Sequence, residues 1–158
     1  MQDQPSQLET APPSAAPRRE QTPRAVAGVI FLVSFGLLAV AAYLQPSAAG
    51  AGTHQQLGLP PCGFLVSTGL PCATCGMTTS FSHATNGDFV AAFLTQPTGS
   101  LLALFTAMTA IVSGYATVTG MSLAPIGRAI WRPRMVVLFV TLLLAGWTYK
   151  IFDTLLGT

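Results

Sequence analysis

The long stretch almost without charge in the middle of this chain constrains its fold more than any other feature. Between Ala25 and Gly127 the only formally charged residue is Asp88. Of all 158 residues, 8% are charged and 51% are hydrophobic, whereas about one-quarter of a typical soluble domain is charged. These figures exclude a soluble enzyme, a nucleic-acid-binding protein with a basic patch and a disordered acidic tail. We expect a small all-α integral membrane protein that contacts the lipid bilayer and no nucleic acid.

Three apolar stretches predict three transmembrane helices, at about residues 25–44, 98–120 and 135–156. A helix rises about 1.5 Å per residue, so about 20 residues cross the hydrocarbon core of roughly 30 Å. The first stretch has an alternative interpretation as a cleaved signal peptide, with residues 49–51 as a small-residue cleavage site. It is longer than the usual apolar core of about 7 to 15 residues, which favours a retained helix.

The residues before the first helix predict a disordered tail. Residues 1–24 contain five prolines and, apart from Leu8, almost no large apolar side chains. Such a segment cannot bury enough surface to offset the entropy lost on ordering. We therefore divide the chain into a cytoplasmic tail, residues 1–24, and a membrane domain, residues 25–158.

The arginines predict the orientation of the three helices. Six of the seven basic residues form two clusters, one before the first helix and one between the second and third. The members are Arg18, Arg19, Arg24, Arg128, Arg132 and Arg134. With three spans both clusters lie on one side, which the positive-inside rule makes cytoplasmic. We expect a bacterial inner-membrane protein with a cytoplasmic N-terminus, and with the cysteine loop and the C-terminus on the extracytoplasmic face.

The third helix carries two charged residues near its end. The apolar run from Met135 to Trp147 would span only about 20 Å, so the helix must continue past Lys150. In one interpretation Lys150 extends to the outer interface beside Trp147 and Tyr149, with Asp153 as its partner. In the other, the pair faces the interior of the helix bundle, where ionisable groups usually mark function.

All three cysteines lie in a segment rich in glycine and proline, residues 57–76. Its prolines argue against a continuous helix exposed to lipid. We expect a loop with a short interfacial or re-entrant helix, together residues 57–87, in which the helix starts near Ala73 or Thr74 and carries the CxxC motif. Asp88 is expected to cap the next helix, Phe89 to Thr95.

A metal site is the first interpretation of the cysteines. Cys72 and Cys75 form a CxxC pair, whose spacing lets both sulfurs point at one centre as in structural zinc sites, and Cys62 precedes Cys72 by ten positions. His83 would lie about 12 Å from Cys75 along one continuous helix, too far to share a zinc ion with it. His54, in a glycine-rich stretch, is the better candidate for a fourth ligand, although water, a lipid head group or another subunit could serve.

Two other interpretations stay open. In a membrane thiol-disulfide oxidoreductase, Cys72 would attack, Cys75 would resolve the mixed disulfide and Cys62 would shuttle; a structural disulfide belongs to the same class. Alternatively, the three cysteines are small buried residues that only pack. A non-enzymatic protein with a metal-binding or structural site is favoured over an enzyme.

The many small side chains between positions 98 and 120 suggest a third function. This stretch is rich in Ala, Thr, Ser and Gly. Small residues let helix backbones approach closely in lipid. The chain is therefore also a candidate accessory subunit of a larger membrane complex, or a homo-oligomer.

The segment from Cys62 to Pro97 resembles a known family. Thr68-Gly69-Leu70-Pro71-Cys72, Cys75-Gly76-Met77-Thr78, Gly87-Asp88 and Gln96-Pro97 are similar, in order and spacing, to the bacterial membrane family labelled domain of unknown function 2752. Three positions depart from the family pattern: Thr79 stands where Arg is usual, Ala73 where Pro is common and Gln96 where Asn is common. Any contact that this arginine makes with an anion in the family cannot be assigned to this chain, which has Thr79 there. The resemblance implies a membrane architecture and a candidate site, without a reaction.

Overall fold

Helices make up every regular element of the computed structural model, which describes residues 21–130 and 132–156. Within these residues there is no strand, which confirms the all-α prediction. The elements are α1 (Gln21–Tyr43), the 3-10 helix η1 (Thr53–Leu57), α2 (Gly63–Thr68), α3 (Met77–Thr85), α4 (Phe89–Thr95), α5 (Pro97–Thr119), α6 (Ala124–Ile130) and α7 (Pro133–Leu156).

Three of these helices are long and apolar enough to cross a membrane, as predicted. They are Arg24–Tyr43, Pro97–Thr119 and Pro133–Leu156, with mean hydropathies of 2.5, 1.8 and 1.9. Their ends differ by a few residues from the predicted ones, and α1 begins at Gln21 within the predicted tail. The remainder of that tail, residues 1–20, lies outside the described residues. The helix α6, between the second and third spans, was not predicted.

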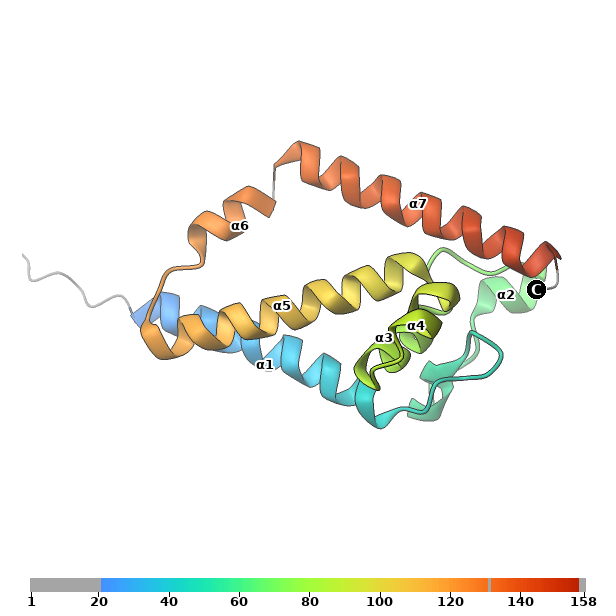
Figure 1. Cartoon of the computed structure of the whole chain (residues 1–158), viewed down its shortest axis with the longest axis horizontal. Coiled ribbons are helices and arrows are strands. Elements are labelled where there is room, and N and C mark those ends of the chain that lie inside the picture. Colours follow the sequence, from blue (N-terminus) through green and yellow to red (C-terminus); the bar gives the residue numbers. More distant parts are fainter. Residues whose placement is uncertain (1–20, 131, 157–158) are drawn as a thin grey trace, which may run out of the picture.

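The helices α1 and α5 run side by side in opposite directions along most of their length (Figure 1). Small residues form the seam between them: Ala27 and Ala110 are buried, and a Cβ atom added to Gly114 would lie 3.1 Å from the ring of Phe31. Arg24 contacts Gly120, so the start of α1 meets the end of α5. The small residues that suggested a partner subunit therefore pack α5 against α1 of the same chain.

Five hydroxyl groups on α5 are bonded within the helix. Each donates to a backbone carbonyl one turn earlier: Thr106 to Leu102, Thr109 to Phe105, Ser113 to Thr109, Thr117 to Ser113 and Thr119 to Tyr115, at 2.6 to 2.9 Å. This pattern is common for Ser and Thr inside helices. These hydroxyls need no partner on another helix.

The helix α7 approaches the other helices near its C-terminal half and diverges from α5 toward α6 (Figure 1). At the closest approach, the Thr98 hydroxyl donates to the Leu142 carbonyl at 2.8 Å. A Cβ atom added to Gly146 would overlap that hydroxyl oxygen, so only glycine fits there. Most large apolar side chains of α7 are exposed, as expected of a helix whose apolar surface faces lipid.

The charged residues of α7, Lys150 and Asp153, form an ion pair with each other. Lys150 is buried, at 7% exposure, and its ammonium group donates to Asp153 at 3.0 Å. Its Nζ atom lies 3.3 Å from where a Cβ atom on Gly50 would stand. The lysine therefore faces the loop that follows α1 and contacts protein on that side.

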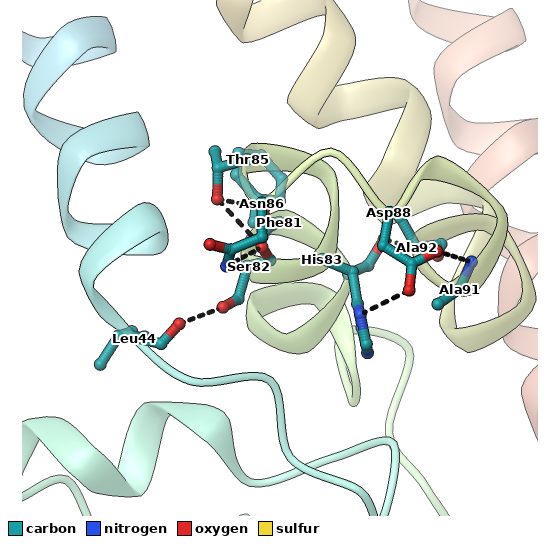
Figure 2. A network of polar contacts seen from close by, with 10 residues as sticks. Leu44, Phe81, Ser82, His83, Thr85, Asn86, Asp88, Ala91 and Ala92 are labelled. Atoms are coloured by element: carbon teal, nitrogen blue, oxygen red, sulfur yellow. Dashed lines mark hydrogen bonds and ion pairs between the residues drawn. The ribbon is translucent and has the colours of Figure 1, made fainter.

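The helices α3 and α4 form a short hairpin beside the end of α1 (Figure 2). The buried Ser82 hydroxyl donates to the Leu44 carbonyl, which joins α3 to the end of α1. The Asp88 carboxylate accepts a hydrogen bond from the Ala91 amide at 3.0 Å, so its predicted role as the N-cap of α4 is confirmed.

The predicted start of the cysteine helix was wrong by three or four residues. Helix α3 begins at Met77, and the CxxC motif lies in the turn immediately before it. Gly76 at the N-cap has φ 84°, a left-handed conformation that cannot continue a right-handed helix. The motif is therefore presented by a turn, whose backbone closes with a hydrogen bond from the Cys75 amide to the Cys72 carbonyl at 3.0 Å.

Candidate functional site

The three cysteines converge at the end of the molecule that carries α3. Their sulfur atoms all lie within 4.8 Å of one another, and none is in a disulfide. The Cys72 and Cys75 sulfurs are 3.3 Å apart. Two thiolates bound to one tetrahedral zinc, each at about 2.3 Å, lie roughly 3.8 Å apart. The three sulfurs are thus close enough together that they could hold one metal ion.

Two separate elements bring these sulfurs together. Cys62 is the N-cap of α2, and its carbonyl accepts the Val66 amide at 3.0 Å. Cys72 and Cys75 flank the turn before α3. The fold closes the ten-residue gap between Cys62 and Cys72 through α2 and the left-handed Gly69 at its end, which has φ 72°. The family motif residues Gly69 and Gly76 are therefore both required by the backbone.

The two thiols of the CxxC motif differ in acidity. Partial burial alone would raise the pKa of Cys72, but hydrogen bonds from Thr74, Cys75 and Cys62 outweigh it and lower that pKa to about 7. Burial raises the pKa of Cys75 to about 12, and donation of its proton to Cys72 adds to the rise. At neutral pH Cys72 is therefore substantially a thiolate, hydrogen-bonded to a protonated Cys75.

Residues far along the chain hold the cysteine turn in place. The Trp147 indole of α7 donates to the Pro71 carbonyl at 2.9 Å, next to Cys72. The Gln96 side chain, fully buried between α4 and α5, donates to the Ala73 carbonyl at 3.3 Å. Sequence reasoning missed both roles, because contacts across 76 and 23 residues leave no local pattern.

Thr79 occupies a buried position that suits a short side chain. Its hydroxyl lies 2.8 Å from the Thr53 hydroxyl of η1, and both residues are fully buried. Thr53 also accepts the Ser47 amide at 3.0 Å. The Thr79 hydroxyl therefore joins α3 to the loop after α1.

Neither histidine belongs to the sulfur cluster in the described part of the chain. The cluster of possible metal ligands there consists of Cys62, Cys72 and Cys75. His83 is directed toward Asp88, with Nδ1 3.8 Å from its carboxylate (Figure 2). The Nε2 atom of His54 lies 3.2 Å from the Pro60 carbonyl oxygen, and His54 lines the same pocket as the cysteines.

A pocket of about 770 Å³ adjoins the three cysteines. One wall comes from the end of α1 and includes Leu37 and Val40, and another comes from Met77 and Phe81 of α3. No Asp, Glu, Lys or Arg is among its described lining residues. A cavity of this size, mostly apolar and with a few polar groups at one side, has the character of a small-molecule site.

The comparisons with known proteins support the resemblance noted in the sequence. No curated protein and no solved structure matches the chain. Residues 62–110 do match the family model described as Protein of unknown function (DUF2752). This match begins at Cys62, continues through α3 and α4 into α5, and agrees with the suspected resemblance over the segment that contains all three cysteines.

Proposed function

We propose that this protein is a multi-pass protein of the bacterial inner membrane whose three cysteines bind zinc. The observation that carries the proposal is the convergence of Cys62, Cys72 and Cys75 within 4.8 Å. Thiolates are preferred zinc ligands, and three of them leave one position of a tetrahedron for another donor. His54 supplies that donor by exchanging the Pro60 carbonyl for the metal.

The charge distribution supports the proposed orientation. Arg24 lies at the start of α1 against the end of α5, and Arg128 lies on α6, which follows α5 directly. The helices α2 and α3, between which the CxxC turn lies, are at the opposite end of the α1 and α5 pair (Figure 1). If the arginine end is cytoplasmic, as the positive-inside rule requires, the zinc site is on the extracytoplasmic face.

Metal analysis of the full chain purified in detergent tests the proposal. We expect about one zinc per chain in the wild type and in the control Ser67→Ala, and almost none in Cys72→Ser or Cys75→Ser. His54→Ala should weaken zinc binding by about 100-fold or more, because roughly 10 to 16 kcal/mol of binding energy is shared among four ligands. Absence of stoichiometric metal from the wild type would reject the zinc site. Unchanged affinity in His54→Ala would reject His54 alone.

The unequal acidity of Cys72 and Cys75 favours a second candidate function, a membrane thiol-disulfide oxidoreductase. The Cys72 thiolate would attack a partner's disulfide and form a mixed disulfide. Cys75, once deprotonated, would attack Cys72, release the reduced partner as a dithiol and leave a Cys72–Cys75 disulfide. The protein's two thiols are oxidised and the partner's disulfide is reduced, so the electrons balance.

Alkylation of the metal-free protein tests this second candidate. Because only the thiolate reacts and the pKa of Cys72 is about 7, alkylation of Cys72 should increase with pH and reach half its maximum near pH 7. Cys75, with a pKa of about 12, should stay unreactive over the same range. If all three cysteines remain reduced in cells exposed to a thiol oxidant, the oxidoreductase is rejected.

A further inference from the structure

The pocket beside the cysteines combines an apolar wall with one polar side. Leu37 and Val40 of α1 belong to the candidate span Arg24–Tyr43 and also line the pocket. The polar groups of the lining, including Cys72, Thr78 and His54, come from the loop and from the start of α3. A molecule dissolved in the bilayer can therefore reach the apolar wall from the membrane side.

Charge decides which class of molecule fits. Among the described residues that line the pocket there is no lysine or arginine to pair with an anionic head group, and no carboxylate to pair with a cationic one. The one anion of the lining, the Cys72 thiolate, is already hydrogen-bonded to Thr74 and Cys75. Burial of an unpaired charge against apolar side chains is strongly unfavourable. A hydroxyl or carbonyl head can instead form hydrogen bonds with the threonine and cysteine side chains.

We infer that this pocket binds an uncharged lipophilic molecule from the bilayer, with an apolar chain against α1 and a single hydroxyl or carbonyl head toward the cysteines. The volume of about 770 Å³ is within the range of roughly 300 to 1,000 Å³ typical of small-molecule sites. The apolar wall comes from the helices, so binding of the ligand's apolar chain does not require a metal. This inference goes beyond the proposed zinc site and is tested separately from it.

Photolabelling of the full chain in phosphatidylcholine nanodiscs tests the inference. The probes are a long-chain alcohol that carries a diazirine and the matched carboxylic acid and quaternary ammonium compounds, and labelled peptides are identified by mass spectrometry. We expect the alcohol to label the pocket at least about tenfold more than either charged probe, because a buried unpaired charge costs more than 1.4 kcal/mol.

Two matched valines on α1 provide the control. Val40 lines the pocket and Val33 does not, although both are exposed, at 44% and 66%. Val40→Trp fills the pocket and should lower labelling there about tenfold, whereas Val33→Trp should leave it within about twofold. Any one of three results would overturn the inference: equal labelling of all exposed helix surfaces, a charged probe that labels as well as the alcohol, or equal effects of the two substitutions.

Removal of zinc with a chelator separates this inference from the zinc proposal. It empties the proposed metal site but keeps every side chain that lines the pocket, so pocket labelling should stay within about twofold of the untreated wild type. Labelling lost in Val40→Trp with zinc retained supports both proposals. A wild type that binds zinc but gives no preferential labelling of the pocket overturns only the lipophile site.

Discussion

The seam between α1 and α5 is stabilised in a different way from the end of the molecule that carries the cysteines. Along the seam, small residues such as Ala27 and Gly114 allow close packing, and the hydroxyls of Ser113 and Thr117 bond within α5 itself. At the cysteine end, buried polar groups join segments far apart in sequence, for example Ser82 with Leu44 and Trp147 with Pro71. Shape therefore aligns the two spans, whereas specific hydrogen bonds fix the position of the sulfurs.

The largest effect should come from Gly76→Ala. A Cβ atom there would lie 2.7 Å from the Gly50 carbonyl oxygen, and the residue has φ 84°. Left-handed strain and the backbone clash together should lower the free energy of unfolding by about 3 kcal/mol. Denaturation in sodium dodecyl sulfate measures this change, and Cys72 alkylation should also lose its half-maximum near pH 7.

Gly69→Ala is the matched control for Gly76→Ala. Gly69 is also left-handed, with φ 72°, but no atom lies within 4 Å of its added Cβ. Gly69→Ala should lower the free energy of unfolding only through conformational strain, by about 1 kcal/mol. Equal costs for the two substitutions would contradict the close contact between the cysteine turn and the loop after α1.

A second large effect is expected from Gly114→Leu in the seam. The new side chain would collide with Phe31, because even a Cβ atom would lie 3.1 Å from its ring. We expect a loss of about 2 kcal/mol in the free energy of unfolding, measured in the same denaturation assay. The matched control is Gly36→Leu on α1, since no atom lies within 4 Å of a Cβ atom there.

The seam substitution also tests whether the two regions are independent. Gly114→Leu should leave the pH dependence of Cys72 alkylation unchanged, because the hydrogen bonds to that thiol lie at the other end of α5. A shift of the Cys72 half-maximum in this variant would show that the seam positions the sulfurs as well.

Trp147→Phe should have a smaller effect, directed at the cysteine end. It removes the hydrogen bond to the Pro71 carbonyl but keeps an aromatic ring. We expect a loss of about 1 kcal/mol of stability and weaker zinc binding, by about tenfold, as found for groups that orient metal ligands. Competition with a zinc chelator measures the second effect.

Tyr149→Phe is the comparison for Trp147→Phe. It removes a hydrogen bond from the same helix to the Leu94 carbonyl, at 3.0 Å, away from the cysteine turn. It should lower stability by a similar amount, about 1 kcal/mol, without a change in zinc affinity. Equal zinc affinities in the two variants would show that α7 does not position the cysteines.

The smallest effect is expected from Asp88→Ala. This substitution removes the N-cap bond to the Ala91 amide and should cost about 0.5 to 1 kcal/mol. Asp88→Asn retains a capping oxygen and should recover most of the loss, as denaturation of both variants would reveal. A full loss in Asp88→Asn would instead assign the effect to the charge that faces His83.

The sequence predicted the elements better than the contacts between them. Runs of apolar residues identified all three spans, and Asp88 identified the start of α4, because both signals are local. The start of α3 was misplaced, since the left-handed turn at Gly76 depends on the approach of Gly50 from another segment. The convergence of Cys62 with the CxxC pair agreed with the predicted ligand spacing, but the pocket and the support from Trp147 and Gln96 are products of tertiary structure.

The hydroxyls of α5 that donate to carbonyls of the same helix have a consequence for biosynthesis. Its mean hydropathy is 1.8, against 2.5 for α1, chiefly because of its many threonines, serines and glycines. Hydropathy scales treat the hydroxyl of threonine or serine as a group without a hydrogen-bond partner in the protein. A threonine or serine that donates to a carbonyl one turn back satisfies its hydroxyl as soon as the helix forms, so the group is less unfavourable in lipid. The translocation machinery should therefore accept α5 as a span on its own, without the need for α1 to pack beside it.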